Sequence, residues 1–310
     1  MRTNKILLST LACSLVLGFS ACKKDAKDND LDKTGMSVHA DDQSRVSAEI
    51  DAVANDASLI LEGNAGFSGR FETVNGIICD ANVTVNTTTN PMTLTVVYDG
   101  TNCLGNRTRT GTVILSMAQG THWKDTGAAV TVTFQDLKVT RVSDNKSITL
   151  NGSQAYTNVS GGLILNLANP QSSITHSITS DGLSVTFDDG SQRTWKIAKQ
   201  RVFTYSGRVV ISTTGTHSEN NITGIAEWGT NRFGQAFTTS VTDPIVLKQD
   251  CNFRVTGGAV KHTLPNASAT VTFGLNSNGM PTGCPGSGHY YYKLMVTGPN
   301  GNSIGLILPY

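Results

Sequence analysis

Carboxylates have the clearest potential for catalysis in this 310-residue chain, but they are sparse. Only three glutamates follow residue 66: Glu72, Glu219 and Glu227. A glycosidase needs two carboxyl groups that flank the scissile bond, and Glu227 with Asp188 or Asp243 is the pair on offer. On base rates we expect these three to be turn or surface residues. We therefore assign no catalytic residue, and the sequence leaves enzymatic activity open while favouring a protein that is not an enzyme.

Other kinds of chemistry find even less support. The sequence contains no GxSxG, HExxH, P-loop or dinucleotide-binding motif. No CxxC pair is present to suggest a zinc site. The six histidines are scattered without the spacing of metal ligands, at positions 39, 122, 176, 217, 262 and 289. We expect neither a metal nor a cofactor.

Five residues are candidates for contact with a ligand. Arg107 and Arg109 alternate with threonines, so both face the same side of a predicted strand and could bind an anionic sugar or a lipid headgroup. Trp123 and Trp228 could supply flat platforms for sugars. Tyr291 points away from the face shared by its two tyrosine neighbours. The alternative is that the arginines pair with carboxylates or cover the sheet with their stems, and that the tryptophans lie in the core.

The first residues of the chain predict export. Arg2 and Lys5 precede an apolar run over residues 6–19, which suits a signal peptide and is short for a membrane-spanning helix. The stretch Leu17-Gly18-Phe19-Ser20-Ala21-Cys22 resembles the lipobox of bacterial lipoproteins. That resemblance implies cleavage after residue 21 and lipidation of Cys22. The alternatives are a secretory signal that leaves Cys22 as a free thiol, and an uncleaved anchor.

A tether and one helix follow the signal peptide. Residues 22–43 are polar and charged, and they predict a flexible acidic linker. Apolar residues then recur at helical spacing and predict a short amphipathic helix over Asp41 to Glu62, which ends at Gly63-Asn64. We expect its apolar stripe to pack on the rest of the protein. A partner-binding helix is the alternative.

From Phe67 onward the pattern predicts an all-β fold. Apolar residues alternate with Thr or Ser, as in antiparallel strands with one solvated face. Strand–helix alternation is missing, which argues against a parallel α/β fold. We expect a sandwich or a curved open sheet. Turns are predicted at Asn75-Gly76, Asp99-Gly100, Asn151-Gly152, Asp181-Gly182, Asp189-Gly190, Asn278-Gly279 and Asn300-Gly301.

Four cysteines remain after the signal peptide and Cys22 are set aside. In an exported chain they imply two disulfides, with three possible pairings. In each half of the chain a cysteine precedes a strand and a second cysteine follows in a loop. This repeated order predicts the bridges Cys79–Cys103 and Cys251–Cys284. It also predicts two related units, residues 44–170 with the helix and residues 171–310, with a seam at Asn169-Pro170.

A longer resemblance agrees with this organisation. The run from Thr93 to Gly100, then Cys103 and the run from Arg107 to Ile114, is similar to a pattern in uncharacterised lipoproteins of the Bacteroidetes. So are Ile222-Thr223-Gly224 with Asn231, Gly234 and Cys251. The likeness covers most of residues 44–300 and departs from the pattern in residues 276–288. It implies a lipid-anchored β protein and no established activity, so it transfers no catalytic residue.

Charge adds little about partners. Without Arg2 and Lys5 the mature chain has 22 basic and 23 acidic residues, and no basic patch for nucleic acid occurs. We expect a protein of the cell envelope, held at the outer membrane by the lipid on Cys22, with a non-catalytic binding or structural role and a glycan or an envelope protein as a possible partner. The alternatives are a carbohydrate-active enzyme or polysaccharide-binding protein, and a lipid carrier. Paired carboxylates beside an aromatic cleft would indicate the enzyme, and an apolar groove open to solvent would indicate the carrier.

Overall fold

The computed structural model describes residues 33–70, 78–168, 173–285 and 288–310. The described residues belong to one compact unit. The predicted signal peptide and Cys22 lie outside the described residues, as do Asn75-Gly76 and Asn169-Pro170. The described unit is mostly strand with one long helix, which confirms the all-β fold class.

The long helix α1 spans Lys33–Gly63 and is followed by the short helix α2, Ala65–Ser68. The predicted start at Asp41 and the predicted tether up to residue 43 were wrong, because α1 begins at Lys33. Met36 is only 3% exposed and His39 is buried. Contacts with the sheet thus stabilise turns whose polar sequence gives no helical signal.

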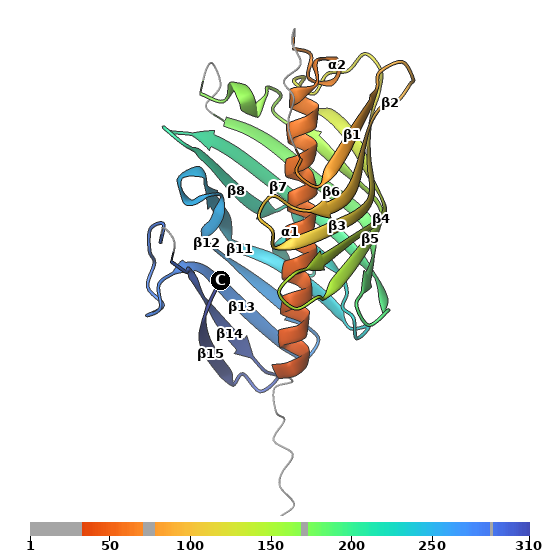
Figure 1. The fold of residues 1–310 in the computed structure, drawn as a ribbon. Coiled ribbons are helices and arrows are strands. Elements are labelled where there is room, and N and C mark those ends of the chain that lie inside the picture. The colour runs from red at the N-terminus through yellow and green to blue at the C-terminus, as the bar shows by residue number, and fades with distance from the viewer. Residues whose placement is uncertain (1–32, 71–77, 169–172, 286–287) are drawn as a thin grey trace, which may run out of the picture. The chain divides into compact units, whose positions relative to one another are not determined.

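In the described part of the chain, fifteen antiparallel strands form a single sheet (Figure 1). The strands are β1 (Ala81–Asn86), β2 (Met92–Thr101), β3 (Arg107–Met117), β4 (Ala128–Arg141), β5 (Ser147–Asn158), β6 (Ser173–Phe187), β7 (Gln192–Tyr205), β8 (Val209–Gly215), β9 (His217–Glu219), β10 (Ile222–Thr230), β11 (Ala236–Lys248), β12 (Arg254–Leu264), β13 (Ala267–Leu275), β14 (Tyr291–Thr297) and β15 (Ser303–Pro309). Short 3-10 turns lie at Ile164–Asn166 and Gln249–Cys251. Neighbouring strands are mostly consecutive in sequence. The sheet is also continuous between β5 and β6, on either side of the predicted seam.

The strands β8 and β10 occupy the same position in the sheet, between β7 and β11. Both strands pair with β7 on one side and β11 on the other, while β9 pairs only with β10. Between β8 and β10 the chain therefore leaves this position, forms a hairpin of β9 with the start of β10, and then returns. A Cβ atom on Gly215 would lie 2.1 Å from the Gly224 carbonyl oxygen, so the crossing at the base of the hairpin requires glycine.

Bulges bend the sheet around α1. Register shifts occur in most of the long strand pairs, including β3–β4, β4–β5, β5–β6 and β6–β7. Bulges increase twist and bend a strand, so a row of them curves the sheet. In Figure 1 the sheet curves around α1, with β2–β5 on one side of the helix and β12–β15 on the other.

Three turn predictions were wrong, and bulges explain two of them. Asp99-Gly100 lies within β2, Asn151-Gly152 within β5 and Asp181-Gly182 within β6. The last two pairs stand at register shifts, and Gly152 has a φ of 110°, which favours glycine in a bulge as it does in a turn. The remaining described turns are confirmed, at 189–190, 278–279 and 300–301.

The main core lies between α1 and the inner faces of β2–β7. Val46, Ile50 and Leu61 of the helix are fully buried against strand residues such as Val132 and Leu150. The predicted apolar stripe of the helix thus packs on the sheet. The exposed helix residues form one narrow stripe: Ser37, Ser44, Ala48, Asn55 and Leu59.

Both predicted disulfides are confirmed. Cys79–Cys103 joins the start of β1 to the loop after β2, with 5.3 Å between the Cα atoms. Cys251–Cys284 joins the start of β12 to the loop after β13, with 5.2 Å between the Cα atoms. The two bridges therefore occupy equivalent places at the two ends of the sheet.

Candidate ligand-binding groove

A large groove separates the first half of α1 from the last strands of the sheet. It has a volume of about 910 Å³. We call it the C-terminal groove, and its lining residues are Ser37, Val38, Ala40, Asp41, Gln43, Ser44, Ser47, Ala48 and Asp51 of α1 with Ile245, Val255, Val260, His262, Val271, Phe273, Tyr292, Leu294, Val296, Ile304, Leu306, Leu308 and Tyr310. The volume is at the upper end of the usual range for small-molecule sites.

The sheet wall of the groove is apolar because of its register. Residues 292, 294 and 296 of β14 lie opposite residues 308, 306 and 304 of β15, which gives three apolar cross-strand pairs on one face. Leu306 remains 50% exposed. Burying such side chains contributes about 25 cal/mol per Å² of apolar surface, so this wall favours an apolar occupant.

The wall that α1 contributes to the groove consists of small and polar side chains. From Ser37 to Asp51 the lining runs along about 21 Å of helix, at 1.5 Å per residue. Its side chains are mainly alanine and serine, which keep the groove wide, with Asp41, Gln43 and Asp51 as larger polar groups. The groove thus has one apolar wall and one hydrogen-bonding wall.

A buried ion pair lies next to the polar wall. The Lys199 ammonium is 2.6 Å from Glu227 Oε1 and donates a 2.7 Å hydrogen bond to Ser47 Oγ. The other carboxylate oxygen of Glu227 accepts hydrogen bonds from Trp195 Nε1 at 2.8 Å and from Gln43 Nε2 at 2.9 Å. This cluster joins α1 to β7 and β10.

Electrostatics keeps this pair charged. Burial alone would raise the pKa of Glu227, but the Lys199 charge and hydrogen bonds lower it below its usual value. The neighbouring carboxylates likewise raise the pKa of Lys199 against the opposing effect of burial. Nearby, burial lowers the pKa of His39 to about 3 and that of His262 to about 4, so both rings are neutral at pH 7.

The position of Glu227 contradicts the expectation of a turn or surface residue and weakens the hypothesis of a glycosidase. It is fully buried, not a turn or surface residue, because Lys199 compensates its charge. Asp188 follows β6 and accepts a 2.8 Å hydrogen bond from Arg232. Asp243 is exposed on β11. The carboxylate of Glu227 is thus occupied by structural partners and closed to solvent, which is unsuitable for a residue that must reach a glycosidic bond.

The two candidate arginines are bound to carboxylates of the protein itself. Arg109 makes two hydrogen bonds to Asp80, of 2.6 and 2.7 Å, and a third of 2.8 Å to Asp56 of α1. Arg107 donates a 2.7 Å hydrogen bond to Glu49 of α1. Both line a small pocket of about 190 Å³ beside Cys103. The two guanidinium groups hold the helix against the sheet and are not free to bind an anionic ligand.

The aromatic candidates do not gather at one site. Trp123 is fully buried and contacts the ring of Tyr156 in the core. Trp228 is partly exposed and stacks on His217, with 4.1 Å between the ring centroids. Tyr291 is partly exposed on the opposite face of β14 from the groove residue Tyr292, as predicted from the alternation.

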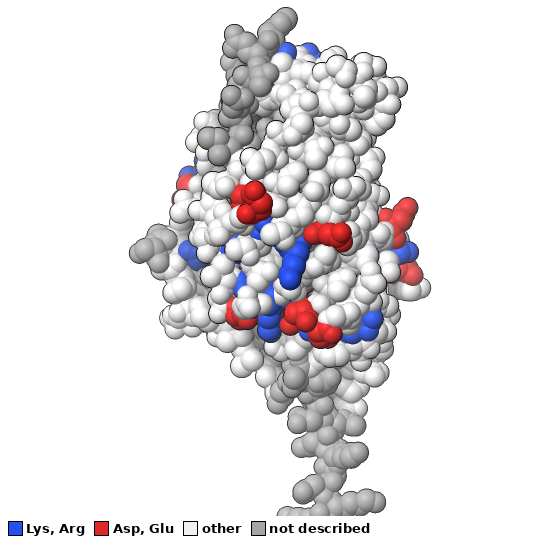
Figure 2. Space-filling view, turned by 45° about the vertical axis from the view of Figure 1, so that its right-hand side comes forward, with Lys and Arg blue, Asp and Glu red and all other residues white. Residues whose placement is uncertain are grey.

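Acidic residues of α1 face basic residues of the sheet along its length. Arg232 donates two 2.6 Å hydrogen bonds to Asp42, and Arg141 donates bonds of 2.7 and 3.1 Å to Asp41. Figure 2 shows charged residues of both signs in a band across the middle of one face, with uncharged surface above it. Pairing with the helix thus accounts for many of the sheet's basic residues.

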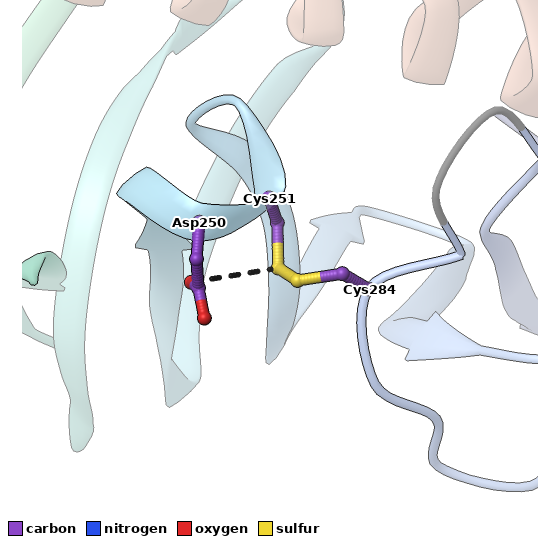
Figure 3. A group of neighbouring side chains, drawn as sticks. All are labelled: Asp250, Cys251 and Cys284. Carbon is purple, nitrogen blue, oxygen red and sulfur yellow. Dashed lines mark hydrogen bonds between the residues drawn. A yellow bond between two sulfur atoms is a disulfide. The ribbon is translucent and has the colours of Figure 1, made fainter.

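Asp250, Cys251 and Cys284 lie close together, but the sulfur atoms are already bonded to each other (Figure 3). Metals bind thiolates, which a disulfide does not provide. Asp250 Oδ1 lies 3.8 Å from Cys251 Sγ, and Asp250 Oδ2 forms a 2.9 Å ion pair with Arg208. The group is therefore a disulfide crosslink with a neighbouring aspartate, not a metal site.

The chain matches no protein-family model, no curated protein and no solved structure, so the resemblance to Bacteroidetes lipoproteins stays a prediction. Within the described residues, no helix is long and apolar enough to span a membrane. The C-terminal groove was not predicted from the sequence. The apolar alternation of residues 290–296 and 304–308 was a usable signal, but alternation alone does not say whether a face is covered.

Proposed function

We propose that this chain is a lipid-anchored protein of the cell envelope whose role is to bind an apolar ligand in the C-terminal groove, without catalysis. The observation that carries this proposal is the groove itself. Its wall of apolar pairs on β14 and β15 remains partly exposed next to a polar helix face. An apolar groove open to solvent is the feature that separates a lipid carrier from a closed structural domain.

The alternative of a carbohydrate-active enzyme has less support. Its proposed carboxylate, Glu227, is enclosed by Lys199, Trp195 and Gln43. The apolar residues of the groove are mostly aliphatic, whereas sugar sites favour aromatic platforms. The lipid-carrier alternative therefore becomes the preferred form of a non-catalytic binding role.

The proposed anchor would keep the groove near the membrane. If Cys22 carries the lipid, eleven residue steps separate it from the start of α1 at Lys33. A fully extended chain of that length spans about 40 Å at most. The groove begins near Ser37, within this reach of the outer membrane. Replacing Cys22 by alanine should release the protein into the soluble fraction, and continued membrane partitioning of that variant would contradict the anchor.

The groove can be tested with a neutral fluorescent probe. We expect N-phenyl-1-naphthylamine to brighten when it binds the mature chain carrying Cys22→Ala, which has no acyl groups of its own. Leu306→Glu places a charge in the apolar wall and should weaken binding about tenfold. Ile307→Glu is the matched control, because Ile307 is 40% exposed on the same strand and does not line the groove. Equal effects of the two substitutions, or no binding by either parent protein, would contradict the proposal.

A further inference from the structure

The charged groups that line the C-terminal groove are carboxylates, beside serine, glutamine and tyrosine groups that both donate and accept hydrogen bonds. The described residues that line the groove include no lysine or arginine. They include two aspartates, Asp41 and Asp51. The head of an amphiphilic ligand would therefore meet negative charge and hydrogen-bond acceptors on the helix wall.

The two aspartates differ in how well they are compensated. Asp41 accepts two hydrogen bonds from Arg141, and Lys146 Nζ lies 4.0 Å away. Asp51 has only the Lys199 ammonium at 3.5 Å from Oδ1, and no hydrogen bond to either of its oxygens comes from the described chain. Asp51 is thus the carboxylate with spare capacity to accept.

Lys199, which pairs with Asp51, and its neighbour Arg201 are both buried. Lys199 is 4% exposed, lies closer to Glu227 than to Asp51, and also bonds Ser47. Arg201 is 2% exposed and donates a 2.8 Å hydrogen bond to Asn55. Lys199 is the cation that pairs with both Glu227 and Asp51, and neither Lys199 nor Arg201 lines the groove. Asp51, with its side chain 35% exposed, is the charge that such a ligand would contact.

We infer that the C-terminal groove selects long-chain amphiphiles with a positively charged amine head, which binds Asp51 while the aliphatic chain lies along β14 and β15. This inference rests on the proposed function and specifies its ligand class. Ammonium groups donate up to three hydrogen bonds and form charge-assisted bonds with carboxylates. A carboxylate or phosphate head at the same place faces repulsion from Asp51 and finds no accessible cation.

Competition between three ligands of equal chain length tests this inference. Hexadecylamine, hexadecanol and hexadecanoic acid would each displace N-phenyl-1-naphthylamine from the mature Cys22→Ala protein at pH 7. We expect the amine to compete about tenfold more strongly than the alcohol, and the acid to compete most weakly. Asp51→Asn should bring the amine to the level of the alcohol and leave the alcohol unchanged. Asp243→Asn removes the same charge from an exposed position outside the groove and should change nothing.

The outcomes separate this inference from the proposed function. If the acid competes as well as the amine, or if Asp51→Asn leaves the preference for the amine intact, the inference is wrong and the groove remains an apolar site. If none of the three ligands displaces the probe, the proposed function fails as well. A thermal unfolding curve for Asp51→Asn that matches the parent protein shows that lost preference is not lost structure.

Discussion

The two sides of α1 meet the same sheet in different ways. Toward β2–β7 the strands alternate cleanly between buried and exposed residues, and the inner side chains form one continuous core with the helix. Toward β12–β15 many residues are only partly buried, and β15 is exposed along nearly its whole length. The helix therefore has a closed side and an open side.

The difference shows that the open side is not needed to complete the core. Only a small cluster around Met36, Ala269 and Val296 joins the start of α1 to the last strands. Beyond this cluster the groove lies between the helix and the apolar faces of β14 and β15. Apolar surface that stays open beside a finished core is a common property of binding sites.

The strongest test of the closed side is Arg109→Ala. Arg109 is buried and joins Asp56 of α1 to Asp80, which follows the disulfide cysteine Cys79. Its removal leaves Asp80 buried without its partner, so we expect a loss of about 3–5 kcal/mol in the free energy of unfolding. Urea denaturation measures this loss. Arg208→Ala is the control, since its exposed pair with Asp250 contributes less than about 1 kcal/mol. Equal losses would show that the ion pairs of the helix are not structural.

A pair of leucines compares the two sides directly. Leu150 of β5 is fully buried in the closed core, whereas Leu306 of β15 is half exposed in the groove. Leu150→Ala should cost about 2–5 kcal/mol of stability because it leaves a cavity. Leu306→Ala should change stability by less than about 0.5 kcal/mol and weaken binding of the apolar probe. A large loss of stability in Leu306→Ala would mean that the open side is part of the core after all.

Three buried histidines make the stability of the protein depend on pH. Burial lowers the pKa of His39 and His176 to about 3 and that of His262 to about 4. Because these folded-state values lie below the ordinary value of 6.5, the unfolded chain binds the protons more readily. Stability is therefore full above pH 6.5 and decreases as the pH falls toward 4. Each histidine contributes a slope of about 1.4 kcal/mol per pH unit within that window.

The variant His39→Leu sharpens this test. The ring nitrogens of His39 form no hydrogen bond with the described residues, so leucine sacrifices none. Urea denaturation between pH 7 and pH 5 should show that the free energy of unfolding depends less steeply on pH. The slope should fall by the contribution of one histidine, about 1.4 kcal/mol per pH unit. An unchanged slope in His39→Leu would contradict a buried neutral histidine at this position.

Local patterns in the sequence were sufficient for the fold class, the disulfides and the core face of the helix. Alternation identifies strands, and the repeated order of cysteines and strands identifies the bridges. The helix start at Lys33 was not predictable, because burial of Met36 and His39 by distant strands stabilises it. Asn151-Gly152 was misplaced because a bulge and a turn favour the same residues.

The candidate site was less accessible to sequence reasoning. The partners of Arg107 and Arg109 are Glu49 and Asp56, about fifty residues away, and only the folded sheet brings them together. The groove lies between α1 and the curved sheet. The curvature of a sheet is set by bulges in many strands together, which no single stretch of sequence reveals.

Mapping where an aliphatic chain contacts the protein tests the central claim most directly. A hexadecanol analogue with a photoreactive diazirine on its chain would be crosslinked to the mature Cys22→Ala protein, and the labelled peptides identified by mass spectrometry. The groove predicts labels on residues 292–296 and 304–308 and on the first half of α1. Labels concentrated on β2–β6, or spread evenly over the surface, would contradict an apolar binding site on the open side of the helix.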